Sequence, residues 1–229
     1  MKLATIWRYP VKSMLGERLA SVLVEQRGLE KDRLFAVRDG DGKLGSGKST
    51  RRFRAMDGLF EFAAIYESGK MVLRLPDGSR LAGDEPGIHA TISHWLGHEV
   101  TLAREATVSH FDAAPLHLLT TSSLRFLQQL LPLTAVDERR FRPSLVIETR
   151  GADLVEDGWV GRTVAIGDVR LVVTQPTERC VMTTFSQSEL EKAPEVLRTI
   201  TQRNQACLGV YATVIAPGMV KCGDRVELQ

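Results

Sequence analysis

The sequence has no long apolar segment. No run of apolar residues approaches the roughly 20 that a helix needs to span a lipid bilayer. The N-terminal residues, MKLATIWRYPVKS, also lack the hydrophobic stretch of a signal peptide. We therefore expect a cytoplasmic protein that has no membrane among its partners.

Cysteine and net charge are also scarce. The chain has three cysteines, Cys180, Cys207 and Cys222, without CxxC spacing, which argues against a disulfide framework and a four-cysteine zinc site. The sequence leaves open that one of the three cysteines is chemically active. The formal charge of +2 is too small to indicate nucleic acid as the main partner. Arginines gather locally, in STRRFRAM at 49–56 and DERRFRPS at 137–144, each of which is a solvated face or half of an anion site.

Apolar residues and short strands are what the sequence does contain. Its 229 residues are 43% hydrophobic, which fits one large domain or two small ones with a full core. Residues 33–44, RLFAVRDGDGKL, predict a strand that runs into an Asp-Gly turn. Residues 61–81 predict three strands joined by Ser-Gly and Asp-Gly turns. Strands at this spacing indicate an antiparallel barrel or sandwich.

Helices are predicted in the middle of the chain. Residues 85–97 place apolar side chains on one face and end at Gly97, where a C-terminal cap belongs. Residues 120–132 open with capping residues and end at Pro132. The last hundred residues return to strands, interrupted by a charged, helix-compatible stretch at 188–205 that is expected to be broken by Pro194. Two more strands around a Pro-Gly turn are expected at 208–228.

Residues 40–50, GDGKLGSGKST, match the P-loop pattern through Gly42, Gly47, Lys48 and Ser49. A functional P-loop joins a buried strand to a long amphipathic helix. The residues that follow, TRRFRAMDGLFEF, contain an Asp-Gly break and no sustained apolar face. We interpret the segment as a glycine-rich hairpin tip and not as a nucleotide site. Another interpretation is that the loop brings its arginines to some other phosphate.

Seven further motifs occur in a fixed order. They are YPVKS at 9–13, DRLFAV at 32–37, TRRF at 50–53, PLHLLTTSSL at 115–124, RFRPSLVIE at 140–148, EDGWVGRTVAIGDVRLVVTQPTERCVMTT at 156–184 and VKCGDRVEL at 220–228. The series resembles the MOSC-domain family with its N-terminal β-barrel domain, which includes the mitochondrial amidoxime-reducing component and bacterial relatives. The resemblance implies an α+β, mostly β fold. An N-terminal β-barrel domain at 1–95 would pack on a C-terminal MOSC β-barrel domain at 96–229 with a few helices.

The resemblance also implies a molybdenum cofactor of the molybdopterin type, held between the two β-rich parts. The position that matches the family's metal ligand is Cys180, in TERC. A soft thiolate suits a metal that already carries dithiolene sulfurs. The thiol must lose its proton to bind a metal, and the adjacent Arg179 favours the anion. Cys207 and Cys222 match no ligand motif and are expected to be structural.

The same motifs imply a set of cofactor-binding residues. Lysine and arginine supply positive charge to a phosphate, and hydroxyls and free N–H groups at a helix start supply donors. The matching positions are Lys12, Ser13, Arg33, Arg51, Arg52, Thr121, Ser122, Arg142, Ser144 and Arg179. Two places depart from the family pattern: Ser144 stands where asparagine is frequent, and FSQSELEKAP at 185–194 replaces an Asp-Pro turn.

The implied function is that of a molybdenum-dependent oxidoreductase that reduces small-molecule N-hydroxylated substrates, with no role for pyridoxal phosphate. The alternative is a non-catalytic molybdenum cofactor carrier or sulfur-transfer module, in which Cys180 holds a persulfide or a transient metal bond. Some bacterial relatives continue into a ferredoxin-like iron–sulfur domain, and this sequence shows neither that domain nor the cysteines for its cluster. The resemblance therefore implies a separate electron-donor protein as partner.

Overall fold

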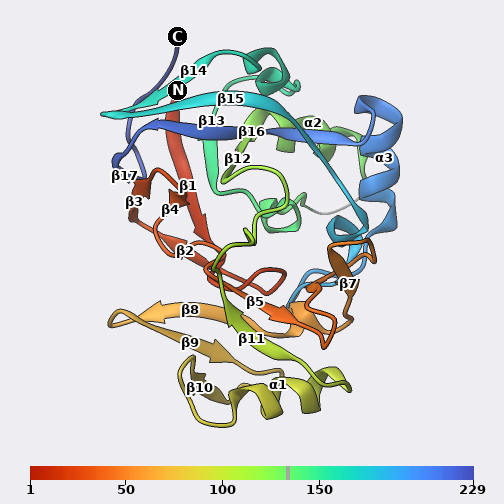
Figure 1. Cartoon of the computed structure of the whole chain (residues 1–229). Coiled ribbons are helices and arrows are strands. Elements are labelled where there is room, and N and C mark those ends of the chain that lie inside the picture. The colour runs from red at the N-terminus through yellow and green to blue at the C-terminus, as the bar shows by residue number, and fades with distance from the viewer. Residues whose placement is uncertain (133–134) are drawn as a thin grey trace.

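The largest sheet has eight strands in the order β18-β14-β15-β16-β12-β13-β1-β2, and it forms the upper part of the molecule in Figure 1. The computed structural model describes residues 1–132 and 135–229. The strands of this sheet are β1 (Lys2–Arg8), β2 (Glu17–Leu19), β12 (Leu116–Thr120), β13 (Leu145–Glu148), β14 (Thr163–Ile166), β15 (Val169–Glu178), β16 (Cys207–Ala216) and β18 (Val226–Leu228). Within this sheet, β12 and β13 are the only neighbouring strands that run parallel, and the other described pairs are antiparallel. The first strand of the chain therefore lies inside a sheet built mainly from its second half.

Three smaller sheets complete the described strands. One has the order β11-β5-β6-β7, from β5 (Phe35–Arg38), β6 (Leu44–Ser46), β7 (Phe53–Ala55) and β11 (Thr101–Arg104). Another is the meander β8 (Ala63–Glu67), β9 (Lys70–Arg74) and β10 (Arg80–Ala82), and the last joins β17 (Gly218–Lys221) to β3 (Ser21–Glu25) and β4 (Gly28–Leu29). The mostly β, α+β class is confirmed, and the strands of the described part form open sheets without a closed barrel.

The described part of the chain has three α-helices, α1 (Ile88–Leu96), α2 (Thr121–Leu130) and α3 (Pro194–Asn204). Short 3-10 helices lie at η1 (Leu59–Glu61), η2 (Glu138–Phe141), η3 (Val155–Trp159) and η4 (Val181–Thr184). Gly97 caps α1 with φ 72°, as predicted. Pro194 occupies the first turn of α3, where its missing N–H costs no helical hydrogen bond, so it starts this helix and does not break it. No helix of the described residues is long and apolar enough to cross a bilayer.

Two large apolar cores correspond to the two β-rich parts. The upper core packs the inward side chains of the eight-stranded sheet, including Leu3, Ile6 and Leu118, together with Val22 and Leu29 from the first 30 residues. The lower core joins β8, β9, η1 and α1, and it lies at the bottom of Figure 1. The chain thus visits the upper part, then the lower part, and then returns. The division into domains at 1–95 and 96–229 stays a prediction.

The P-loop-like segment forms a hairpin and not a nucleotide-binding loop. β5 and β6 are antiparallel neighbours that pair Arg38 with Leu44, and the turn between them is closed by hydrogen bonds to Asp39. After Gly47 and Lys48 the chain enters β7, which runs parallel to β6. No helix starts here, so the dipole and free N–H groups that hold a nucleotide's phosphates are missing.

Gly47 has a packing role that explains its place in this segment. A Cβ atom built on it would lie 2.4 Å from Met182 Cγ and 2.8 Å from a ring carbon of Phe185. Since Met182 Cγ lies in the middle of its side chain and the Phe185 ring is rigid and packed against Phe60, we expect Gly47→Ala to destabilise the fold by about 1–3 kcal/mol. Urea denaturation measures this change. Gly40→Ala is the matched control, because a Cβ there meets no atom within 4 Å. Equal stability of the two variants would contradict the packing role.

Candidate functional site

A cavity of about 530 Å³ lies where the two β-rich parts meet. Its walls come from the turn after β1, the residue Arg33 before β5, the β6–β7 segment, the loop at 111–115, residues 140–144, the end of β15 through η4, and β16. These segments converge in the middle of Figure 1. The volume is in the range of small-molecule and cofactor sites, about 300–1,000 Å³.

Cys180 stands at the edge of this cavity. It lies two residues after the end of β15 and is the N-cap residue of the 3-10 helix η4, so a strand precedes it closely and a helical turn follows it. Its carbonyl accepts hydrogen bonds from the backbone N–H (3.1 Å) and the hydroxyl (2.9 Å) of Thr183. The thiol is free and half-buried, and it lines the cavity. These are the conditions under which a cysteine can serve as a ligand or nucleophile.

Three arginines of the cavity wall have no carboxylate partner among the residues that the structure describes. Arg140, Arg142 and Arg179 donate only to backbone carbonyls: Glu191 for Arg140 (2.6 Å), Met14 for Arg142 (2.6 Å) and Phe141 for Arg179 (2.6 Å). One N–H of each is buried without a hydrogen-bond partner. Buried donors of this kind are costly, so their retention points to an anionic ligand that would satisfy them.

The pKa shifts of Arg142 and Arg179 agree with their lack of carboxylate partners. Burial lowers the pKa of Arg142 to about 10, and Arg33 adds to the effect by repulsion. Burial also lowers the pKa of Arg179, while Tyr211 and Cys180 act in the opposite direction. Both side chains lie against aromatic rings: the guanidinium carbon of Arg142 is 4.1 Å from the centroid of Tyr9. The cavity thus holds positive charge that the protein itself compensates only in part.

Two other cations of the cavity are paired. Lys12 is buried, and its Nζ contacts Asp112 Oδ1 at 2.8 Å. Burial lowers the pKa of Lys12, although Asp112 acts against it. Burial acts to raise the pKa of Asp112, but the nearby cations Lys12, Arg33 and Lys48 together bring it below its ordinary value. Arg33 forms an ion pair with the fully buried Asp32. With Lys48 also in the wall, cations outnumber carboxylates around the cavity.

Three residues of the wall have a backbone conformation that is unusual for side chains with a Cβ. Ser13, Arg33 and Arg142 have φ values of 65°, 50° and 51°. Non-glycine residues in this left-handed region cost of order 1 kcal/mol or more each, and such strain is concentrated at functional sites. In each case the conformation belongs to a residue that the sequence motifs predicted for the site.

The structure brings seven of the eleven predicted site residues to this one cavity. They are Lys12, Ser13, Arg33, Arg142, Ser144, Arg179 and Cys180. All seven lie outside the helices and strands, and they come from four separate parts of the chain, at 12–13, 33, 142–144 and 179–180. Whether they bind a cofactor stays a prediction.

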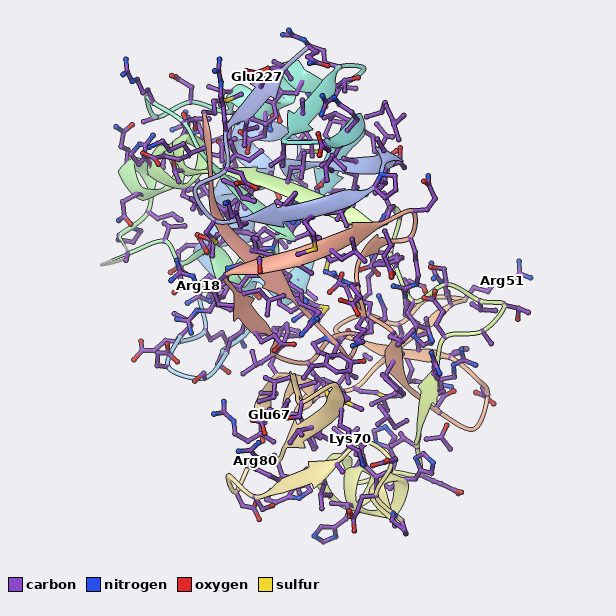
Figure 2. The ribbon with its side chains drawn as sticks, turned by 90° about the vertical axis from the view of Figure 1, so that its left-hand side faces the viewer. Arg18, Arg51, Glu67, Lys70, Arg80 and Glu227 are labelled. Carbon is purple, nitrogen blue, oxygen red and sulfur yellow. The ribbon has the colours of Figure 1, made fainter. Side chains whose placement is uncertain are left out.

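The other four predicted residues do not line the cavity. Arg51 is exposed, and Figure 2 shows it at the outer end of its loop, pointing away from the body of the protein. Arg52 donates to the carbonyls of Ser109, Phe111 and Asp112, so it holds the 109–112 loop in place and is not among the residues that line the cavity.

Thr121 and Ser122 also lie elsewhere, at the start of α2. The hydroxyl of Thr121 donates to the carbonyl of Thr149, and that of Ser122 donates to the carbonyl of Asp153. The helix cap is supplied by Thr120, which accepts from the N–H of Ser123. These hydroxyls stabilise the helix start against the following loop, which is why their position gives the cofactor prediction no support.

Sequence reasoning missed several members of the wall. Arg140 lies in the same RFRP motif as Arg142 and is more deeply buried, but nothing in the motif distinguishes the two. The sequence pattern assigns Lys48 to a P-loop match or to a glycine-rich hairpin tip, and neither interpretation predicts its place in this wall. Asp112, Tyr211 and Cys207 carry no local signal, because they enter the wall through strand pairing and loop packing.

His110 and His117 are both buried and neutral. The Nδ1 of His110 lies 3.1 Å from the carbonyl of Arg33, and its Nε2 lies 3.1 Å from the guanidinium of Arg38, so one ring nitrogen donates and the other accepts. Burial lowers the pKa of His110 to about 4 and that of His117 well below its ordinary value, with Arg179 adding to the second effect. Neither histidine is therefore suited to donate a proton near neutral pH.

This burial predicts an acid-sensitive fold. The unfolded chain binds a proton at His110 near pH 6.5, whereas the folded chain does so only near pH 4. Stability is therefore full above about pH 6.5 and falls as the pH decreases toward 4. Between pH 7 and pH 5 we expect His110 to account for a loss of about 2 kcal/mol in the free energy of unfolding. Urea denaturation at both pH values should show a smaller loss for His110→Gln, and an equal loss would refute the assignment.

Comparison with known proteins identifies the class. The model of the MOSC domain matches residues 105–227, and that of the MOSC N-terminal beta barrel domain matches residues 1–117. The chain therefore belongs to the MOSC-domain family, and the resemblance inferred from its motifs is confirmed.

Three individual proteins show how similar this chain is to known sequences and structures. The molybdenum cofactor sulfurase of Drosophila willistoni is 28% identical over 216 residues, which is 88% of this chain and 26% of that protein. The molybdenum cofactor sulfurase of Drosophila erecta is 33% identical over 133 residues, or 53% of this chain and 16% of that protein. The chain thus spans about a quarter or less of these relatives. The YuaD protein from Bacillus subtilis has a similar fold, with a TM-score of 0.56, 12% identity and coverage of 99% of this chain and 94% of that one.

Proposed function

We propose that the cavity binds a pterin-type molybdenum cofactor and that the Cys180 thiolate is the protein ligand to the metal. The observation that carries this proposal is the free, half-buried thiol of Cys180 in the wall of a cavity, three of whose arginines lack carboxylate partners among the residues that the structure describes. A phosphate-bearing cofactor would supply the missing negative charge, and a soft metal would accept the thiolate. Membership of the MOSC-domain family supports the same conclusion.

The residues present fit such a group. Lys12 and Arg33 each form an ion pair with a carboxylate, and each could also contact a phosphate. The buried N–H groups of Arg142 and Arg179 that have no partner would donate to phosphate oxygens or to a pterin ring. Phosphate accepts the two parallel N–H groups of a guanidinium in the same plane. These four side chains would therefore bind and orient the cofactor, while Cys180 would hold the metal.

When bound, the molybdenum cofactor supplies two-electron oxygen-atom chemistry, which protein side chains cannot perform. The chain's own contribution is to hold the thiolate, to neutralise the anion and to shield the site. Burial raises the pKa of Tyr211, although Arg179 opposes the effect, so its phenol stays protonated and remains a hydrogen-bond donor in the wall. Phe53, Phe111 and Phe141 cover the cavity with apolar surface that limits access of water.

We further propose that the reaction is reduction of small N-hydroxylated compounds, with electrons delivered by a separate donor protein. The support for this finer assignment is the similarity of the sequence motifs to reductases of the MOSC-domain family. A cytoplasmic location belongs to the same proposal.

A second candidate is sulfur transfer or cofactor carriage. Two observations favour it: the relatives named molybdenum cofactor sulfurase, and the presence of a second thiol, Cys207, in the wall of the same cavity. In this case Cys180 would carry a persulfide and pass its outer sulfur to an acceptor thiolate, so that the S–S bond at Cys180 breaks, the acceptor becomes the persulfide and Cys180 returns to the thiolate.

Expression in a host that makes the cofactor, followed by elemental analysis, tests the binding. About one molybdenum per chain is expected. Turnover of a hydroxylamine or amidoxime with a chemical reductant would then support the reductase. A persulfide at Cys180 by mass spectrometry, without turnover, would support sulfur transfer. Absence of molybdenum from protein made in such a host would overturn the cofactor proposal.

A further inference from the structure

A second cavity, of about 310 Å³, opens beside the first. The two share Ser46 and Met182 in their walls, and the hydroxyl of Ser46 lies 3.7 Å from the sulfur of Met182. Met182 is two residues beyond Cys180 in the chain, within η4. A ligand in the second cavity therefore lies next to the segment that carries the reactive thiol.

The floor of the second cavity is apolar and partly aromatic. Met56, Leu59 and Phe60 are buried, and Phe60 meets Phe185 edge to face with 6.4 Å between ring centroids. Gly47 contributes no side chain, which leaves Met182 and Phe185 close to the backbone of the β6–β7 segment. Rings and methionine sulfur form a surface that binds aromatic and branched apolar groups well.

The rim of the second cavity has the opposite charge character from the first. Asp57 and Glu61 are exposed there, and neither has an ion-pair partner within residues 1–132 and 135–229. Lys192 is the one basic residue of this wall. A phosphate would be repelled by the two carboxylates, so an extended cofactor is a poor occupant. A compound with an apolar body and a positive charge is a good one.

We propose that the second cavity is a substrate subsite that binds the aromatic or branched apolar body of a cationic N-hydroxylated compound. This inference rests on the proposed function, since it assumes that the reacting N–O group points past Met182 toward Cys180. The apolar body packs against Phe60, Phe185 and Met182, and a positively charged end lies between Asp57 and Glu61. Substrate preference is then set by the segments 57–61 and 182–185 and not by the residues of the positively charged first cavity.

Binding of three small probes to the purified protein tests the subsite without any need for turnover. Phenethylamine, 2-phenylethanol and phenylacetate share one ring and carry positive, zero and negative charge. We expect affinity to decrease in that order, measured by ligand-observed NMR or calorimetry. In Asp57→Asn/Glu61→Gln the affinity for phenethylamine should fall about fivefold and that for 2-phenylethanol should stay unchanged, since each exposed charge contributes about 0.5 kcal/mol. Phe185→Ala should weaken the amine and the alcohol alike.

Matched controls separate this site from general effects of charge and ring removal. Glu85→Gln/Glu99→Gln removes two exposed carboxylates in the α1 region, and Trp95→Ala removes an exposed ring of α1. Neither should change binding of any probe. Equal affinity for the three probes, or equal effects of the control and test variants, would overturn the subsite. Because the probes need no molybdenum, their binding can be measured on protein that contains no cofactor. If protein from a host that makes the cofactor binds the probes as expected but contains no molybdenum, the subsite is supported and only the proposed function is contradicted.

Discussion

Cys180→Ser is expected to reduce molybdenum-dependent turnover by at least about 100-fold while the protein stays folded. A serine hydroxyl has nearly the same size as a thiol, but it is a hard donor that keeps its proton and does not replace a soft thiolate. Loss of a residue that hydrogen-bonds to a metal ligand already lowers metal affinity or activity about 10–100-fold, so loss of the ligand itself should lower turnover further. Molybdenum content, turnover with a chemical reductant and thermal unfolding are the three measurements.

The other cysteines supply controls for this result. Cys222 packs at the edge of the upper core, where its thiol contacts the carbonyl of Leu19 at 3.4 Å, and it does not line the cavity. Cys222→Ser should therefore leave molybdenum content unchanged. Cys207→Ser removes the second thiol of the cavity and separates the two candidate functions, since a reductase should tolerate it better than a sulfur-transfer protein. Full turnover of Cys180→Ser would remove the metal-ligand assignment.

Arg142→Met is expected to lower cofactor occupancy about 10- to 100-fold with little change in stability. The arginine donates Nη1 to the carbonyl of Met14, stacks on Tyr9 and leaves Nη2 unpartnered in a buried position. Hydrogen bonds to charged groups contribute about 1.5–3 kcal/mol, which is the affinity lost with an anionic ligand. Methionine keeps the apolar stem over the ring and removes a buried charge without a carboxylate partner, so the two changes in folding energy largely cancel.

The measurement is molybdenum and phosphate content per chain, together with the free energy of unfolding in urea. Arg51→Met is the matched control, since Arg51 is exposed and lies outside the cavity although the sequence motifs predicted it for the site. Occupancy in Arg51→Met should equal that of the parent. If Arg142→Met keeps full occupancy, the unpaired guanidinium has no ligand to bind and the anion-site interpretation is wrong.

Local features of the fold were predictable because they depend on neighbouring residues. The Ser-Gly and Asp-Gly turns of residues 61–81 gave the meander β8–β10, and Gly97 marked the end of α1. The C-terminal segment was predicted as two strands and contains three, because β16, β17 and β18 belong to two different sheets that no local pattern reveals. The insertion of β1 beside β13 was invisible for the same reason.

The site residues also divide into those that a local motif predicts and those that it does not. Lys12 and Cys180, which lie in loops of the cavity wall, were predicted from their motifs. Arg52 and Thr121 have the right chemistry, but backbone carbonyls occupy their donors, and this depends on loops at 109–112 and 149 that fold against them. Asp112 was missed because its role comes from an ion pair with a residue 100 positions away.

The path of the chain also limits when a ligand can be captured during synthesis. Lys12 leaves the ribosome early, yet its cavity is closed by Arg142, Cys180 and Tyr211, and β1 waits for β13 before it has a partner on that side. Contacts over such long separations form late and slowly. A nascent polypeptide that has not yet reached these segments therefore lacks the finished pocket, so any ligand of this cavity binds only after residues as far apart as 12 and 211 have folded together.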